Sequence, residues 1–134
     1  MPRQPASQPT DVELEILQVL WDTGPATVRQ VHDVLGASRR TGYSTTLKMM
    51  QVMTDKGLLL KDASVRPQLY RPAQQQEQTQ IGLLDDLLQR AFGGSARKMI
   101  LRAAAAERIT PEELGEIQEL IDRADKGGSD DESA

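Results

Sequence analysis

The chain has 134 residues, no cysteine and a net charge of −4, and its length suits one domain or two small ones. The lack of cysteine excludes disulfides, thiolate catalysis and zinc fingers built on cysteine. No apolar run reaches the roughly 20 residues of a membrane span, and residues 1–9 do not resemble a signal peptide. We therefore expect a soluble cytoplasmic protein without membrane insertion.

The charges are distributed unevenly along the chain. Residues 1–72 carry a net charge of +2 and residues 73–134 a net charge of −6. Residues 39–71 contain seven Lys and Arg residues and only two Asp residues. Since local charge and not the total decides contact with a polyanion, this basic segment is a candidate for binding nucleic acid. The alternative interpretation is a solvated surface.

Two helices are predicted at the start of the chain. Thr10 with Glu13 has the spacing of a capping box, and the helix that it starts should end at Gly24. Thr27 with Gln30 predicts a second cap and a shorter helix. The apolar positions expected to face the core are Leu14, Leu17, Leu20, Trp21, Val28, Val31 and Leu35.

A third helix is predicted over residues 43–56, ending at Gly57. At 100° per residue it has two faces of different chemistry. The face expected to pack holds Tyr43, Thr46, Met49, Met50 and Met53. The face expected to stay free holds Ser44, Thr45, Lys48, Gln51, Val52 and Asp55.

A β-hairpin is predicted next, from apolar residues at 58–60 and 68–70 that flank a polar stretch. Three helices followed by such a hairpin form a winged helix-turn-helix, whose third helix fits the major groove of DNA. Short hydroxyl side chains at the start of that helix allow close approach, and the cations suit phosphates. The expected DNA contacts are Arg39, Arg40, Tyr43, Ser44, Thr45, Thr46, Lys48, Gln51 and Arg66.

Three further helices are predicted in the second half. Residues 74–80 are predicted to form either a glutamine-rich hinge or the first turn of the fourth helix. Ser95 should cap the fifth helix, and Thr110 with Glu113 the sixth. Their apolar stripes exceed what three short helices can cover, so we expect a homodimer. The expected dimer contacts are Ile81, Leu84, Leu88, Ala91, Met99, Ile100, Leu114, Ile117 and Ile121.

The fold class is therefore mainly α, with four segments expected along the chain. Residues 1–9 are a disordered N-terminus and residues 10–73 a winged helix-turn-helix domain that binds DNA. Residues 74–126 form a helical dimerisation domain, and residues 127–134 an acidic disordered tail.

Several short motifs resemble those of the penicillinase repressor family (BlaI/MecI/CopY). They are ELEIL at 13–17, LW at 20–21, GPATV at 24–28, YSTTLK at 43–48, KGL at 56–58, YRP at 70–72, DLL at 86–88, FGGS at 92–95 and TPEEL at 110–114. The resemblance implies a homodimeric transcriptional repressor whose winged helices bind a pseudo-palindromic operator on double-stranded DNA. It also implies a membrane-protease sensor as a partner.

The chain departs from the family pattern at three points. It lacks the cysteines with which copper-responsive members capture metal. Arg102 and Ala103 stand where penicillin-responsive members are cut between Asn and Phe, so cleavage at that bond is not expected. Val52 occupies a position on the third helix where the family often has Arg, so the operator preference should differ.

The other classes of function find less support. The chain has no nucleophile with a base, no glycine-rich phosphate loop and no metal-ligand set, so we expect no enzyme, cofactor or metal. The single histidine, His32, is expected on the surface without a carboxylate partner. A protein-interaction module without specific DNA binding is the main alternative. A repressor that responds to a small molecule would need an apolar cavity between the DNA-binding unit and the dimerising helices.

Overall fold

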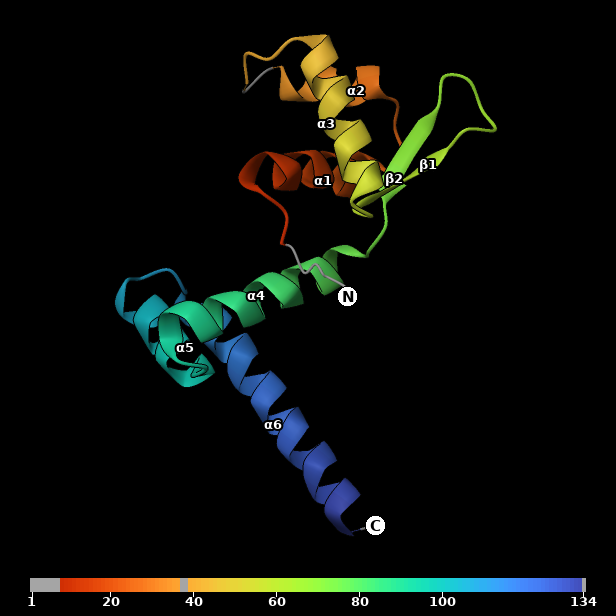
Figure 1. The fold of residues 1–134 in the computed structure, drawn as a ribbon. Helices are drawn as coiled ribbons and strands as arrows, with labels where there is room; N and C mark the ends of the chain where they lie inside the picture. The colour runs from red at the N-terminus through yellow and green to blue at the C-terminus, as the bar shows by residue number, and fades with distance from the viewer. Residues whose placement is uncertain (1–7, 37–38, 134) are drawn as a thin grey trace. The chain divides into compact units, whose positions relative to one another are not determined.

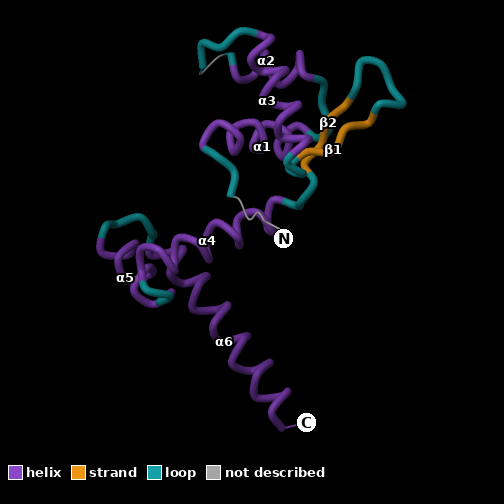
Figure 2. Tube along the Cα trace, in the orientation of Figure 1, coloured by secondary structure: helices purple, strands orange, loops and turns teal. Residues whose placement is uncertain are grey.

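The computed structural model describes residues 8–36 and 39–133, with side chains described as far as Asp125 (Figures 1 and 2). The elements in chain order are α1 (Asp11–Thr23), α2 (Val28–Leu35), α3 (Tyr43–Asp55), β1 (Leu59–Asp62), β2 (Leu69–Pro72), α4 (Gln76–Phe92), α5 (Ala96–Ala105) and α6 (Pro111–Ser133). This order confirms the predicted class, a winged helix followed by a helical region. The chain divides into two compact units, Met1–Leu84 and Asp85–Ala134.

The division between the units lies within α4, later than the boundary that the sequence suggested after residue 73. The start of α4 and the residues just before it contact the first unit. Thr79 is buried, the indole N–H of Trp21 donates to the Gln74 carbonyl over 3.4 Å, and the Gln8 amide donates to the Gly82 carbonyl. Of the predicted N-terminal disordered segment, residues 1–7 lie outside the described residues.

Helices α1 and α2 begin at the predicted capping boxes. The Thr10 hydroxyl accepts from the Glu13 amide at 3.2 Å, and the Thr10 amide donates to the Glu13 carboxylate at 2.9 Å. Thr27 and Gln30 exchange the same two hydrogen bonds. Helix α1 ends at Gly24, whose φ of 88° suits a residue without a side chain.

The core of the first unit lies between α1, α2, α3 and the hairpin. Its buried apolar side chains are Ile16, Leu17, Val19, Leu20, Ala26, Val28, Val31, Leu35, Met50, Met53, Leu59 and Tyr70. The predicted core is confirmed, except that Leu14, Trp21 and Met49 are only partly buried and Tyr43 is exposed. Helix α1 buries a wider face than the single predicted stripe, because α2, α3 and β2 all contact it.

The predicted hairpin is present as the antiparallel strands β1 and β2, with Leu59 opposite Pro72 and Asp62 opposite Leu69. The sequence did not reveal a further pairing of β2. Ala26, in the α1–α2 connection, exchanges two backbone hydrogen bonds with Tyr70, at 3.0 and 2.8 Å. The hairpin is thus bonded directly to the helical part of the unit.

The second unit contains the end of α4 with α5 and α6. The Ser95 hydroxyl accepts from the Lys98 amide at 3.1 Å, and Thr110 with Glu113 forms the predicted capping box. Helix α4 starts at Gln76, which favours the first-turn interpretation of residues 74–80 over the hinge. The prediction of an acidic disordered tail was wrong for the backbone of residues 127–133, because α6 continues to Ser133. Its two glycines weaken a helix without having to end it.

Candidate nucleic-acid interface

The outer face of α3 is free, as the sequence predicted. Six side chains on this face are exposed: Ser44, Thr45, Lys48, Gln51, Val52 and Asp55. The opposite face is anchored by the fully buried Met50 and Met53. Tyr43, the first residue of the helix, lies between the exposed and the buried face, since 37% of its surface is exposed. The helix thus offers a polar surface on a rigid support.

Thr46 does not lie on this surface, so the prediction that it contacts DNA was wrong. Only 1% of its surface is exposed, because the helical period places it on the packed face. Its hydroxyl shares a hydrogen bond of 3.0 Å with Nδ1 of His32. His32, expected on the surface, is half-buried, and its partner is this hydroxyl group.

Arg39 is engaged within the first unit. Its Nε donates to Oε1 of Glu15 at 2.9 Å and its Nη2 donates to Oε2, in the bidentate geometry that guanidinium and carboxylate favour. The hydrogen bond from Arg39 lowers the pKa of Glu15 and raises that of Arg39. The structure therefore does not leave Arg39 available as the expected phosphate contact in the unbound protein.

Lys56 is the second cation that is neutralised by α1. Its Nζ lies 2.7 Å from Oε2 of Glu13, which is 6% exposed. Burial alone would raise the pKa of Glu13, but the hydrogen bonds from Lys56 and Thr10 outweigh it and lower that pKa. Glu13 thus serves both as a cap and as a counter-charge. The capping motif revealed only the first of these roles.

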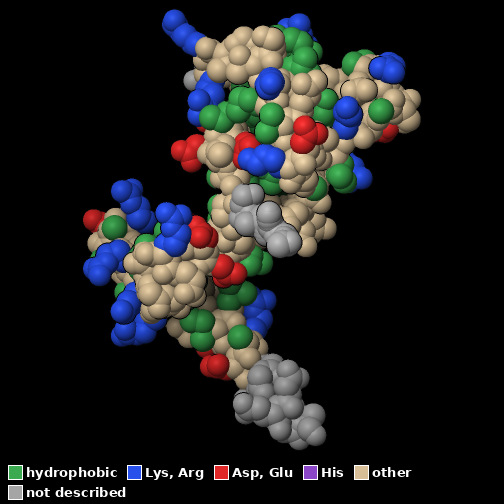
Figure 3. All heavy atoms as spheres, in the orientation of Figure 1, with side chains coloured by type: hydrophobic (Ala, Val, Ile, Leu, Met, Phe, Trp, Pro, Cys, Tyr) green, Lys and Arg blue, Asp and Glu red, His purple; other side chains and the backbone are tan. Residues whose placement is uncertain are grey.

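The remaining cations of the basic segment are exposed and form no ion pair at contact distance within the described part of the chain. These are Arg40, Lys48, Lys61, Arg66 and Arg71. Arg66 lies in the turn between β1 and β2, and Lys48 on α3. On the face drawn in Figure 3, Lys and Arg side chains lie over the helices and the hairpin of the first unit. Unpaired cations near an exposed helix suit contact with a phosphate backbone.

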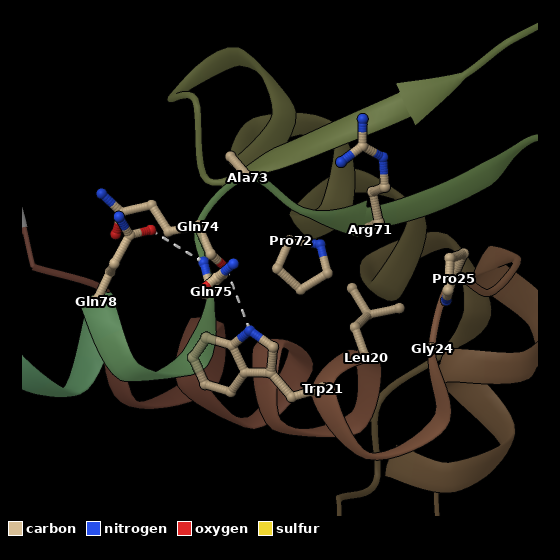
Figure 4. Close-up of a pocket in the computed structure, with 10 residues that line it drawn as sticks. All are labelled: Leu20, Trp21, Gly24, Pro25, Arg71, Pro72, Ala73, Gln74, Gln75 and Gln78. Carbon is tan, nitrogen blue, oxygen red and sulfur yellow. Dashed lines mark hydrogen bonds between the residues drawn. The ribbon is translucent and has the colours of Figure 1, made fainter.

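A shallow pocket of about 550 Å³ lies between the end of α1, the end of β2 and the start of α4. In Figure 4 the side chains of Gln74, Gln75 and Gln78 gather at its Trp21 end, and Pro25 lies at the other end. The pocket lies within the first unit, so it is not the cavity that a small-molecule response would require. Among residues 8–36 and 39–125, no His, Asp and Glu side chains cluster as a metal site.

The expected dimer contacts leave much apolar surface uncovered in the single chain. Ile81 is 58% exposed and Ile121 is 48% exposed. Leu84, Ala91 and Leu114 are also exposed, whereas Leu88, Met99, Ile100 and Ile117 are half-buried. Leu87, Leu101 and Leu120, which the sequence did not single out, are exposed as well.

Three helices, a two-stranded wing and a polar third helix define the first unit as a winged helix-turn-helix. The family model described as penicillinase repressor matches residues 9–123. The chain is 30% identical, over 118 residues, to "Transcriptional regulator BlaI" of Mycobacterium tuberculosis, strains CDC 1551 / Oshkosh and ATCC 25618 / H37Rv. The matched region covers 87% of this chain and 85% of each relative. The chain belongs to the penicillinase repressor family.

This membership makes the chain a DNA-binding transcriptional repressor and not an enzyme. In the described part of the chain, none of the helices has the length and apolarity needed to cross a bilayer.

Proposed function

We propose that the chain acts in the cytoplasm as a homodimer that represses transcription by binding a pseudo-palindromic operator. The observation that carries this proposal is the exposed polar face of α3, flanked by cations that have no carboxylate partner among the described residues. A helix with such a face fits the major groove.

The side chains of this face divide into two roles. Ser44, Thr45 and Gln51 are short or amide-bearing groups suited to base edges, and Lys48 can reach a guanine or a phosphate. Arg40 and Arg66 flank the helix and suit phosphates, which position the protein without specifying sequence. Tyr43 stands at the start of α3, where its ring can contact the sugar-phosphate backbone.

The second unit supports the dimer. Exposed leucine and isoleucine side chains recur along α4, α5 and α6, and exposed apolar side chains in such number favour association. A second copy is the economical partner because the same surface then covers itself. Two-fold symmetry would require two half-sites whose centres lie a near-integral number of roughly 10 bp turns apart.

Binding of the full chain to DNA from upstream of its own gene tests the proposal. Fluorescence anisotropy at two salt concentrations, with excess random competitor DNA, should show selective and salt-sensitive binding. Sedimentation equilibrium should show a dimer. Binding no better than to competitor would overturn the proposal and favour a protein-interaction module.

We further propose that release from DNA does not proceed by cleavage of the Arg102–Ala103 bond by a membrane-protease sensor. Arg102 and Ala103 stand where the penicillin-responsive members are cut between Asn and Phe, so the side chains at that cleavage site are not present in this chain. Intact mass measured on the repressor from induced cells should show no fragment that ends at Arg102, and such a fragment would contradict this expectation.

A further inference from the structure

Tyr43, the first residue of α3, is held by two side chains of α2. The guanidinium carbon of Arg29 lies over the tyrosine ring, 4.2 Å from its centre. The His32 ring stands nearly perpendicular to it, with an interplanar angle of 83° and 5.8 Å between ring centres. The residue before the helix, Gly42, provides no side-chain cap. Contacts from α2 therefore restrain the first turn of α3 in place of a cap.

These contacts are connected to the core. His32 is half-buried and shares its hydrogen bond with the hydroxyl of the buried Thr46. A tyrosine ring that is restrained in this way has few alternative rotamers. The position of the Arg29 guanidinium above the ring is therefore determined by packing, although Arg29 itself is exposed.

The charge of Arg29 is not neutralised within the described part of the chain. Arg39, Lys56 and Arg90 each pair with a carboxylate, but none of the described carboxylates lies within 4 Å of Arg29. Stacking on a tyrosine uses the flat face of the guanidinium and leaves its N–H groups at the edge free to donate. Arg29 thus presents an oriented, unpaired donor set beside the start of α3.

We propose that Arg29 is a further DNA contact, which binds a backbone phosphate next to the point where α3 enters the groove. This inference rests on the proposed function, because it adds an α2 residue to the same interface. Exposed Ser44 and Thr45, at the same end of α3, are the residues that would face the bases. A phosphate is the expected ligand because a planar guanidinium fork matches its oxygens.

The test compares the full chain with its Arg29→Ala and Arg29→Lys variants, on both upstream DNA and random DNA. Because both subunits of the dimer lose one phosphate contact, the salt slope of log K should fall by about 2 for Arg29→Ala on both DNAs. Relative to 1 M salt, that change corresponds to about 30- to 45-fold weaker binding at 0.15 M. Arg29→Lys keeps the charge and should keep most of the slope.

Two further measurements separate a phosphate contact from a structural role. Arg90→Ala removes an exposed arginine that is paired with Asp86 in the other unit, and it should leave the slope unchanged. In a double-mutant cycle with Tyr43→Leu, Arg29→Ala should weaken binding less than it does in the natural sequence, because the ring no longer orients the guanidinium.

The outcomes are distinguishable. Selective binding by the unsubstituted chain together with an unchanged slope in Arg29→Ala would overturn this inference and leave the proposed function intact. A lack of DNA binding by the unsubstituted chain would overturn the proposed function. If the salt slope falls equally for Arg29→Ala and for Arg90→Ala, Arg29 contributes only general positive charge. That outcome would also overturn the inference.

Discussion

Glu13→Gln removes one charge from the most buried ion pair among the described residues. Glutamine keeps an oxygen that can accept from the Thr10 amide, so the capping bond survives while the pair with Lys56 is lost. Exposed pairs contribute below about 1 kcal/mol, and breaking a fully buried pair costs about 3–5 kcal/mol. Because Glu13 is buried but Lys56 remains 35% exposed, we expect a loss of about 1–2 kcal/mol in unfolding free energy.

The effect should depend on pH in a defined direction. Burial opposes ionisation of Glu13, but the bonds from Lys56 and Thr10 lower its pKa below the ordinary value of 4.5. An acid whose folded pKa is lowered stabilises the fold above its unfolded pKa, and this contribution is lost as the pH falls through the folded value. The difference between the natural chain and Glu13→Gln should therefore be complete at pH 7 and shrink below about pH 4.

Trp21 provides the assay. It is the single tryptophan, it is half-buried on α1, and its indole donates to the Gln74 carbonyl, so its fluorescence reports unfolding of the first unit. Urea titrations at fixed protein concentration give the midpoints. Glu15→Gln, which breaks the more exposed pair with Arg39, is the matched control and should shift the midpoint less. Equal midpoints for Glu13→Gln and the natural chain at pH 7 would refute the reasoning, as would a difference that is undiminished at pH 3.5.

The remaining predictions concern DNA and the dimer. Lys48→Ala should weaken operator binding and Thr45→Ala should alter base preference, and unchanged affinity in a folded double variant, measured by anisotropy, would contradict both. Arg66→Ala should lower the salt slope by about 2 on all DNA, because the dimer loses two contacts, whereas Arg39→Ala should lower it less because Glu15 already compensates Arg39; equal slopes for the two variants would argue against this ranking. Leu88→Asp should place a charge in the dimer contact and produce monomers in sedimentation equilibrium; a persistent dimer would place the interface elsewhere.

The parts of the fold that the sequence predicted well are those encoded over short distances. Capping boxes at Thr10, Thr27 and Thr110 connect residues three positions apart, so the signal and the structure share the same few residues. The helical period of α3 separated buried Met50 from exposed Lys48 in the same way. The same period places Thr46 on the packed side of α3, which conflicts with the prediction that it contacts DNA.

The parts that the sequence did not predict join residues far apart in the chain. Glu13 meets Lys56 across 43 positions, and Arg39 meets Glu15 across 24. Which carboxylate faces which cation depends on how α1 packs, and residue spacing contains no information on that. The cations available for DNA are consequently fewer than the basic segment suggested. Arg29 was overlooked because it lies outside that segment and gains its orientation only from Tyr43.

The two backbone hydrogen bonds between Ala26 and Tyr70 also affect the DNA that this protein can accept. They join β2 to the connection before α2, so the separation between the wing and α3 is set before DNA arrives. A rigid pair of contacts loses little conformational entropy on binding. The DNA must then change its groove width to fit the protein, and the stiffness of DNA depends on its sequence. Base pairs that no side chain touches should therefore influence affinity, through the energy needed to bend or narrow the duplex between the two contacts.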